Sequence, residues 1–484
     1  MIQTINSVNV VEQLIKRNIG ELRFIGLTEY EGQREKLGDF YWNRQNKFEY
    51  LEYYGFKNQL DLPLETLNIT KRIIDKISLI YKNPPDRYLI KGELPLDDDP
   101  YVDYLNEHPY FHISLKTAER MKNLYHNVLF RPMWYNDKWN FWIETEWIPH
   151  FADGDPFTPI AYSIPVKRDT TETMIDRIST ENWYMFWSKD VYCWHNASGK
   201  VKPDPSGQYD DMRNPFGLFP FVEMRKEIAV DEYWPQGNID LVEINQAVNI
   251  LLNDLNYAIH FQSYDQPYAT GVSPREVPQD ARYPSNADLK VDLTKILLLE
   301  DPQAKLGLLG FNPKILDTIE AIKEKVKFAA WKNNLSLSFS KEGAPASGFS
   351  LMVQNIDLLE GREDDVDTCA AYEQEIYKII QVQTEVFDTD TPALPKLEKD
   401  LRLIIDFAEI DFPINEAEKR EADDWDIEHN IKTPIDIIQE RNAMTEEEAE
   451  EKFRKNKEVN GKYGRKEELR DILREPEEEP DEFA

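Results

Sequence analysis

Lysine side chains gather in one stretch of an otherwise acidic chain. The full sequence carries 57 Lys and Arg against 90 Asp and Glu, a formal net charge of −33 at pH 7. Residues 314–341 reverse this balance, because lysines outnumber carboxylates there. Such a cluster suits contact with a polyanion, although a solvated helix face with Lys and Glu three or four residues apart has the same composition. The lysines are Lys314, Lys323, Lys325, Lys327, Lys332 and Lys341.

Residue patterns for catalysis are sparse. The phosphate-binding pattern GxxxxGK[ST], the dinucleotide pattern GxGxxG, the nucleophile pattern GxSxG and the zinc pattern HExxH do not occur. Glu144 and Glu146 stand in an aromatic-rich stretch that is compatible with a pair of glycosidase carboxylates. His108 and His112 are separated by a proline, which favours a surface turn. We therefore expect no enzyme activity, no cofactor and no metal site, and keep a carbohydrate-active enzyme as the alternative.

Composition excludes several broad classes of protein. The acidic excess is unlike a general nucleic-acid coat, since phosphate binding draws on basic side chains. With 41% hydrophobic and 12% aromatic residues, the chain has material for about two to four folded units. Its two cysteines, Cys193 and Cys369, are too few for a disulfide framework or a thiolate metal site. Neither a long apolar run nor a signal-peptide pattern occurs, so we expect a soluble protein with no membrane partner.

Helical and β patterns alternate in the N-terminal half. Apolar residues three and four apart predict helices within residues 10–80 and again at about residues 105–129. From about Met133 to Arg225, aromatic and β-branched residues separated by turn formers predict a mainly antiparallel β region. Segregated helical and β segments of this kind predict the α+β fold class.

Two helices and a short β module are predicted in the middle of the chain. Residues 237–263 show one apolar face at helical periodicity. A proline-rich stretch follows to residue 311 and predicts a small irregular β module. Asn312 and Pro313 then form a start signal for a second helix that reaches Lys332. The packing face of the first helix contains Ile244, Val248, Leu251, Leu252 and Leu255.

A small, polar segment at residues 333–348 predicts a mobile loop. Beyond it, the pattern predicts a long helix over 349–387 with Gly361 as a kink, a strand over 401–412, and helices capped at Thr433 and Thr445. Residues 476–484 form an acidic tail that we expect to stay disordered. The loop residues of interest are Asn333, Asn334, Ser340, Lys341, Gly343, Ser347 and Gly348.

The order of these parts resembles the portal proteins of tailed bacteriophages, the ring-shaped head-to-tail connectors. The resemblance rests on the β region closing with NPFGLFPFVEMR, the helix IDLVEINQAVNILLNDLNYAIHFQS and the following QPYATG. It continues through the proline-rich stretch, the second helix, the loop ending ASGFSLM and the long helix behind it. The late segment INEAEKREADDWDIEHNIKTPIDIIQERNAMTEEEAEE completes it. It covers about residues 60–460, and its specificity lies in the order of the parts.

The resemblance implies a portal-like α+β subunit with named parts. Residues 1–236 would form a β-rich and helical wing, 237–263 and 312–332 a two-helix stem, and 264–311 a small α/β clip. Residues 333–348 would form a tunnel loop that projects into a channel. A long helix and wing strand would occupy 349–412 and a helical crown 413–475, followed by the tail at 476–484.

The same resemblance implies a function without a catalytic centre. Portal subunits form a homo-oligomeric, dodecameric ring at one capsid vertex of the virion, and double-stranded DNA is packaged and ejected through it. The implied partners are the terminase large subunit, head-completion or adaptor proteins, and the major capsid and scaffolding proteins, met first in the host cytoplasm during assembly. Another virion tail or baseplate protein is a further alternative. The DNA-channel candidates are Lys323, Lys325, Lys327, Lys332 and Lys341.

Overall fold

The computed structural model divides the chain into two compact units. The first comprises Met1–Phe339 and Asn355–Glu409, and the second comprises Ser340–Gln354 and Ile410–Ala484. Helices and sheets are both present, which confirms the α+β class. The structure describes residues 10–15, 27–45, 65–92, 94–95, 100–135, 138–152, 154–166, 183–196, 199–205, 211–228, 232–262, 266–270, 305–309, 315–335, 356–387, 401–408, 423–429, 431–442 and 445–463.

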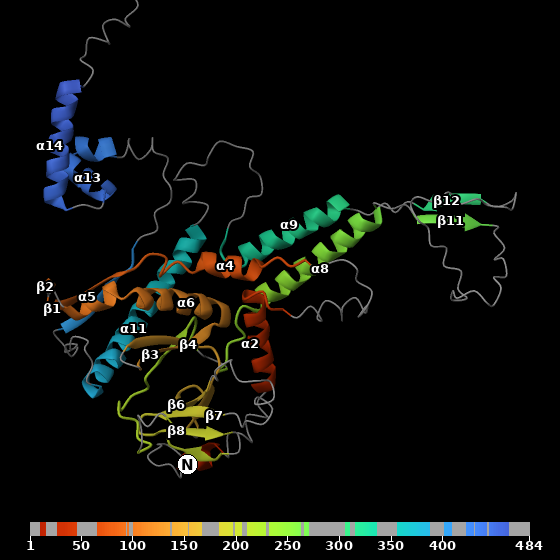
Figure 1. Cartoon of the computed structure of the whole chain (residues 1–484), viewed down its shortest axis with the longest axis horizontal. Coiled ribbons are helices and arrows are strands. Elements are labelled where there is room, and N and C mark those ends of the chain that lie inside the picture. Colours follow the sequence, from red (N-terminus) through yellow and green to blue (C-terminus); the bar gives the residue numbers. More distant parts are fainter. Residues whose placement is uncertain are drawn as a thin grey trace, which may run out of the picture. The chain divides into compact units, whose positions relative to one another are not determined.

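The core of the first unit is built around helix α6 (Pro109–Tyr125) and the strand that follows it. Pro109 opens α6 at a position where a missing amide costs nothing. His126 ends the helix in the left-handed conformation, with φ of 61°. Strand β3 (Asn127–Trp134) begins directly afterwards, so the helix predicted to reach residue 129 is wrong beyond Tyr125. Figure 1 shows α6 between α4 and β3.

Three further helices and one sheet complete this core. They are α2 (Leu27–Tyr41), α4 (Ile69–Ile77) and α5 (Pro100–Glu107), with the three-stranded antiparallel sheet β10 (Val222–Arg225), β3 and β4 (Trp139–Glu144). All but the last residue of β3 are buried, because α6 and α11 (Ile356–Val386) both pack on it. The helix α11 continues through Gly361, where a kink was predicted.

A second sheet has five antiparallel strands in sequence order. These are β5 (Ile148–Phe151), β6 (Pro159–Pro165), β7 (Trp183–Ser188), β8 (Tyr192–Asn196) and β9 (Val201–Lys202). Aromatic side chains such as Trp147, Tyr162 and Trp187 bury one face of the sheet, and the helical residues 10–15 pack against other strand residues. The predicted antiparallel β region is therefore confirmed, although it starts at Asn127 instead of Met133.

A third sheet joins distant parts of the chain. Its strands are β13 (Leu401–Asp406), β1 (Asp86–Lys91) and β2 (Leu94–Pro95), so the strand predicted over 401–412 is confirmed for its first six residues. Arg87 of β1 forms a two-pronged ion pair with Glu373 of α11, at 2.5 and 3.0 Å. Both side chains are only 2% exposed. The pair connects segments that are nearly three hundred residues apart.

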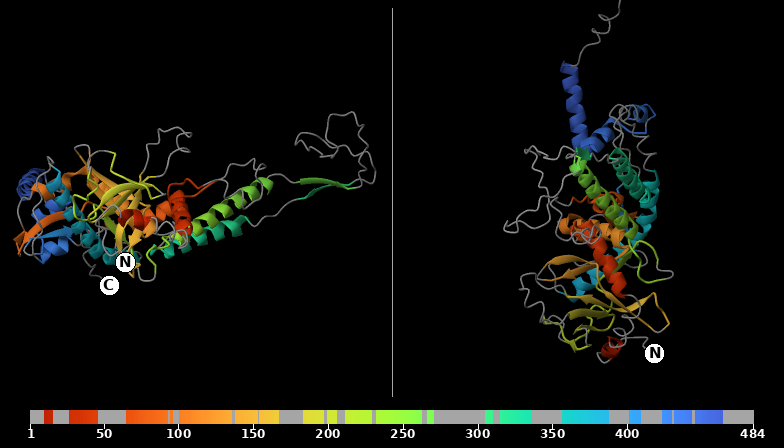
Figure 2. Two further views of the ribbon diagram at one scale, coloured as in Figure 1. Left: turned by 90° about the horizontal axis from the view of Figure 1, so that it is seen from below. Right: turned by 90° about the vertical axis from the view of Figure 1, so that its right-hand side faces the viewer.

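Two long helices lie side by side in the first unit, α8 (Ile239–Gln262) and α9 (Ile315–Trp331) (Figures 1 and 2). Between them in sequence, β11 (Gln266–Thr270) pairs antiparallel with β12 (Lys305–Leu309). Two helices separated by a β module were predicted from the sequence, and this arrangement is present. Residues 271–304 and 312–314, which belong to the predicted clip and to the start of the second helix, lie outside the described residues.

The second unit contains α13 (Pro434–Asn442) and α14 (Glu446–Tyr463), which pack on each other. The predicted cap at Thr433 is present, and one of the two bonds of the capping box predicted at Thr445 is present. Thr445 accepts the amide of Ala449 with its carbonyl and donates its own amide to the Glu448 carboxylate at 3.2 Å. Before α13, Thr433 donates its amide to the Asp436 carboxylate, and its side-chain hydroxyl accepts the Asp436 amide, which are the two bonds of a capping box. The acidic tail 476–484 lies outside the described residues.

Candidate functional site: the α8–α9 hairpin

The hairpin formed by α8 and α9 begins at a close approach to α6. Gly237 has φ of +68°, and a Cβ atom built there would stand 2.9 Å from the Leu124 carbonyl oxygen. Only glycine avoids both the strain and the collision. The next amide, that of Asn238, donates to the same carbonyl at 2.8 Å. The end of α6 therefore fixes the point at which α8 starts.

The side chains of the predicted packing face of α8 are buried to different extents along the helix. Val248 is fully buried and Leu255 is 9% exposed. Ile244, Leu251 and Leu252 are half-buried, and Ile244 packs against the main core. Half-buried leucines on a helix of this kind leave apolar surface that a further contact can cover.

Asparagines end α9 and tie it to the start of α8. Asn334 adopts the left-handed conformation, with φ of 57°. The amide of Leu335 donates to the Ala330 carbonyl at 2.9 Å, which is the bonding pattern of a Schellman helix end. The Asn333 side chain donates to the Ala329 carbonyl and accepts a hydrogen bond from Asn238 at 2.8 Å. The first two residues of the predicted tunnel loop thus complete the helix.

A row of three buried asparagines on α8 holds a distant segment of backbone. Asn245, Asn249 and Asn253 are at most 2% exposed and follow one another at intervals of four residues. Their side-chain oxygens accept hydrogen bonds from alternate amides of the segment 65–69. The pairs are Asn253 with Glu65 at 3.0 Å, Asn249 with Leu67 at 2.8 Å, and Asn245 with Ile69 at 3.4 Å.

The spacing of this asparagine ladder has a simple geometric cause. Four residues of helix rise about 6 Å, and two residues of extended chain span about 6.5 Å. Every fourth side chain of α8 therefore meets every second amide of the facing segment, and Asn253 also donates to the Glu65 carbonyl. Sequence reasoning missed this contact, although asparagine at regular four-residue spacing was the available signal.

The candidate channel lysines lie on two different sides of α9. At about 100° per residue, Lys323 and Lys327 point roughly 160° away from Lys325 and Lys332. Lys332 pairs with Asp240 of α8, and Lys327 with the neighbouring Glu324, both at 2.5 Å. One channel wall can therefore hold only two of the four. Lys341, Ser340, Gly343, Ser347 and Gly348 lie outside the described residues.

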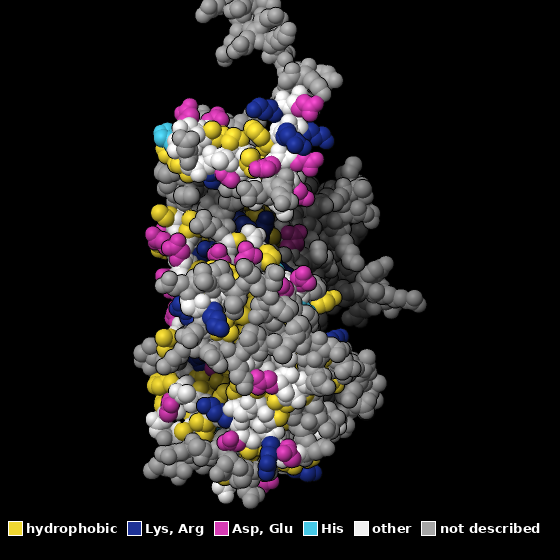
Figure 3. All heavy atoms as spheres, turned by 90° about the vertical axis from the view of Figure 1, so that its left-hand side faces the viewer, with side chains coloured by type: hydrophobic (Ala, Val, Ile, Leu, Met, Phe, Trp, Pro, Cys, Tyr) yellow, Lys and Arg dark blue, Asp and Glu magenta, His cyan; other side chains and the backbone are white. Residues whose placement is uncertain are grey.

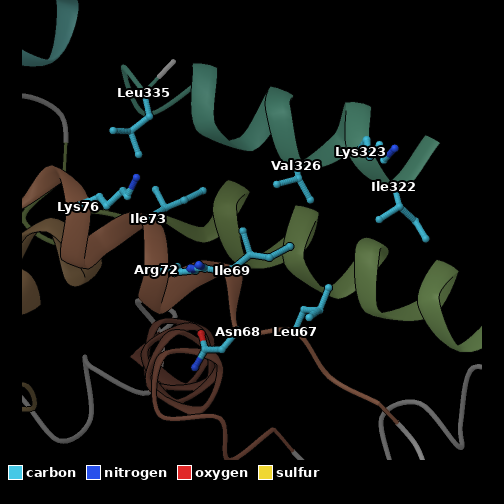
Figure 4. A pocket seen from close by; sticks show the side chains of 10 residues that line it. All are labelled: Leu67, Asn68, Ile69, Arg72, Ile73, Lys76, Ile322, Lys323, Val326 and Leu335. Atoms are coloured by element: carbon cyan, nitrogen blue, oxygen red, sulfur yellow. The ribbon is translucent and has the colours of Figure 1, made fainter. Parts of the chain in front are cut away.

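A groove opens between α4 and α9 beside Lys323 (Figure 4). Its volume is about 410 Å³. Ile69 and Ile73 of α4 and Ile322 and Val326 of α9 line it with apolar surface. Its edge is basic, because Arg72, Lys76 and Lys323 are exposed there and none of them pairs with another residue in the described ranges. We call this surface the basic groove.

The residues considered for catalysis are used structurally. Glu144 is buried and forms an ion pair with Arg131 at 2.7 Å, whereas Glu146 is exposed. His108 precedes the first residue of α6, and burial lowers the pKa of His112 within it. Within the described part of the chain, no group of three or more His, Cys, Asp or Glu side chains is arranged to hold a metal ion. The structure brings no carboxylate pair together at these positions.

A buried hydrogen-bonded chain in the five-stranded sheet also escaped prediction. Ser163 contacts the Nε2 atoms of His150 and His195, both at 2.7 Å. Nδ1 of His195 lies 3.0 Å from the Asn196 carbonyl and therefore carries its proton. Burial lowers the pKa of His150 to about 3 and that of His195 to about 4, so both rings are neutral. Ser163 is 0% exposed, which keeps substrates away from its hydroxyl.

On the face drawn in Figure 3, acidic and basic side chains are intermixed. Among the residues the structure describes, no helix is long and apolar enough to cross a bilayer.

No family model matches the chain, and no curated protein matches it.

Proposed function

We propose that this protein is a portal-like subunit that assembles into a ring around a DNA channel at a capsid vertex. The observation that carries the proposal is the α8–α9 hairpin with the β11–β12 pair between its helices. This is the order of stem, clip and stem implied by the resemblance. A translocation ring of this kind needs no catalytic centre of its own.

Exposed apolar side chains on α9 support assembly. Leu316 is 78% exposed, Phe328 49% and Trp331 70%. Side chains of this size in water on one helix are typical of surfaces that a partner covers. A homo-oligomeric ring, dodecameric as in portal proteins, provides such a partner at every subunit.

The charge distribution supports passage of DNA in preference to tight binding. A strong phosphate contact holds DNA in place, whereas a wall of net negative charge repels it. Against a formal charge of −33, the few lysines of α9 act as weak guides. Because they lie on two sides of the helix, we assign the guiding role to one pair only, either Lys325 with Lys332 or Lys323 with Lys327.

The proposal extends to location and partners. The ring would reside in the virion and assemble in the host cytoplasm. The terminase large subunit would dock on the segment between α8 and α9, and head-completion, capsid and scaffolding proteins would contact the remainder.

Electron microscopy of the purified full chain, with mass measured in solution, tests the proposal. We expect rings with a central channel and a mass near twelve copies of 57.0 kDa. Fibres, or rings without a stem, would instead favour another tail or baseplate component. A monomer that persists across protein concentration and salt would contradict the proposal.

A further inference from the structure

Helix α9 carries a second distinctive surface besides its part of the basic groove. Phe328 and Trp331 lie one turn apart, with ring centroids 5.9 Å from each other. Glu324 and Glu320 are exposed on the same side of the helix, one and two turns before Phe328. We call these four residues the acidic aromatic face.

The two surfaces point in opposite directions. At about 100° per residue, the acidic aromatic face is centred roughly 160° around α9 from Val326, which lines the basic groove. One copy of the chain therefore cannot place its own aromatic face in its own groove. The aromatic face of a second copy can enter the groove of the first copy, and the groove of the second copy then stays open for a third copy.

Shape and charge match between the two surfaces. The groove offers apolar walls and about 410 Å³, within the range of pockets that enclose an aromatic group. Its edge presents Arg72, Lys76 and Lys323. The opposing face presents Glu320 near the rings, and its Glu324 already pairs with Lys327 of the same helix. Opposite charges around an apolar anchor are the usual arrangement at protein interfaces.

We propose that the basic groove of one copy receives the acidic aromatic face of a second copy. This inference rests on the proposed ring, because it supplies a contact between neighbouring subunits. Since donor and acceptor surfaces differ, the contact is head-to-tail, and repeated head-to-tail contacts close into a ring when the rotation per subunit allows it.

Two variants test the two surfaces one at a time. The groove variant R72E/K323E reverses two charges at the edge, and the face variant F328A/W331A removes the anchor. All four side chains are at least partly exposed, so both variants should fold, which thermal unfolding checks. Tyr110→Ala serves as a control, because Tyr110 is 68% exposed and belongs to α6, which contributes no residue to either surface.

Mass photometry of the full chains gives a distinctive expected result. Wild type and the Tyr110→Ala control should oligomerise, and each interface variant alone should associate at least about 30-fold more weakly. An equimolar mixture of the two variants should form dimers and stop there, because one intact groove then meets one intact face.

The opposing outcomes are equally clear. Rings from both variants would overturn this interface and leave the proposed ring function standing. A mixture that associates no better than either variant alone would also overturn it, and would favour a groove that binds an acidic segment of another protein. A wild-type chain that never oligomerises would overturn both the interface and the ring.

Discussion

Replacing Asn249 with alanine tests the asparagine ladder most directly. Asn249 is 0% exposed, and its side chain accepts the amide of Leu67 at 2.8 Å. Alanine removes the acceptor and leaves that amide without its partner. The bond is only part-buried and Leu67 itself is 44% exposed, so its loss should cost about 1 kcal/mol. This corresponds to a roughly 5-fold larger opening constant for this segment.

Asn256 provides the matched control, since it is an asparagine on the same helix outside the ladder and only half-buried. Asn256→Ala should change the free energy of unfolding by less than about 0.5 kcal/mol. Chemical denaturation gives the global stability, and hydrogen exchange reports the local opening. In Asn249→Ala the amides of Leu67 and its ladder neighbours should exchange faster. Equal behaviour of the two variants would refute the role given to the ladder.

Three further predictions concern stability. The pKa values of His150 and His195 in the folded chain lie near 3 and 4, below the value of about 6.5 for an unfolded chain. Lowering the pH from 7.5 to 5.0 should therefore reduce the free energy of unfolding by about 2 kcal/mol for each ring. A denaturation midpoint that does not change with pH would contradict this. Glu373→Ala should cost about 3–5 kcal/mol, since Arg87 then stays buried without its partner, and a loss below 1 kcal/mol in urea titrations would count against it. Asn334→Gly should keep the thermal stability and Asn334→Ala should lose about 1–2 kcal/mol, given the positive φ of this residue; equal melting temperatures would show that the helix end is not strained.

The sequence predicted the elements of the hairpin well, because helical periodicity is a local signal. Residues 239–262 form one helix, as the spacing of Val248 and Leu255 indicated. The same signal failed at residues 126–129, where the left-handed His126 ends α6 and a buried strand begins. A short apolar run fits either structure, and only the packing of α6 and α11 on β3 decides between them.

Long-range polar contacts could not be predicted in this way. The Arg87–Glu373 pair and the His150–Ser163–His195 chain depend on which strands and helices become neighbours. The lysines show a different limit. Their clustering was visible in the sequence and their division between two sides follows from the predicted helix, but the pairing of Lys332 with Asp240 depends on how α8 and α9 pack.

The ladder also has a mechanical consequence for the hairpin. The ties of Asn238 to α6 and of Asn253 to the segment at Glu65 support α8 from its first turn to about two thirds of its length. The last nine residues, about 13 Å of helix, extend beyond the last of these hydrogen-bonded ties, and α9 packs alongside α8. A beam held along most of its length bends far less under a sideways force than one held at its end alone. Load applied near Gln262 would therefore be transmitted to the core, and the most compliant point of α8 would lie just past Asn253.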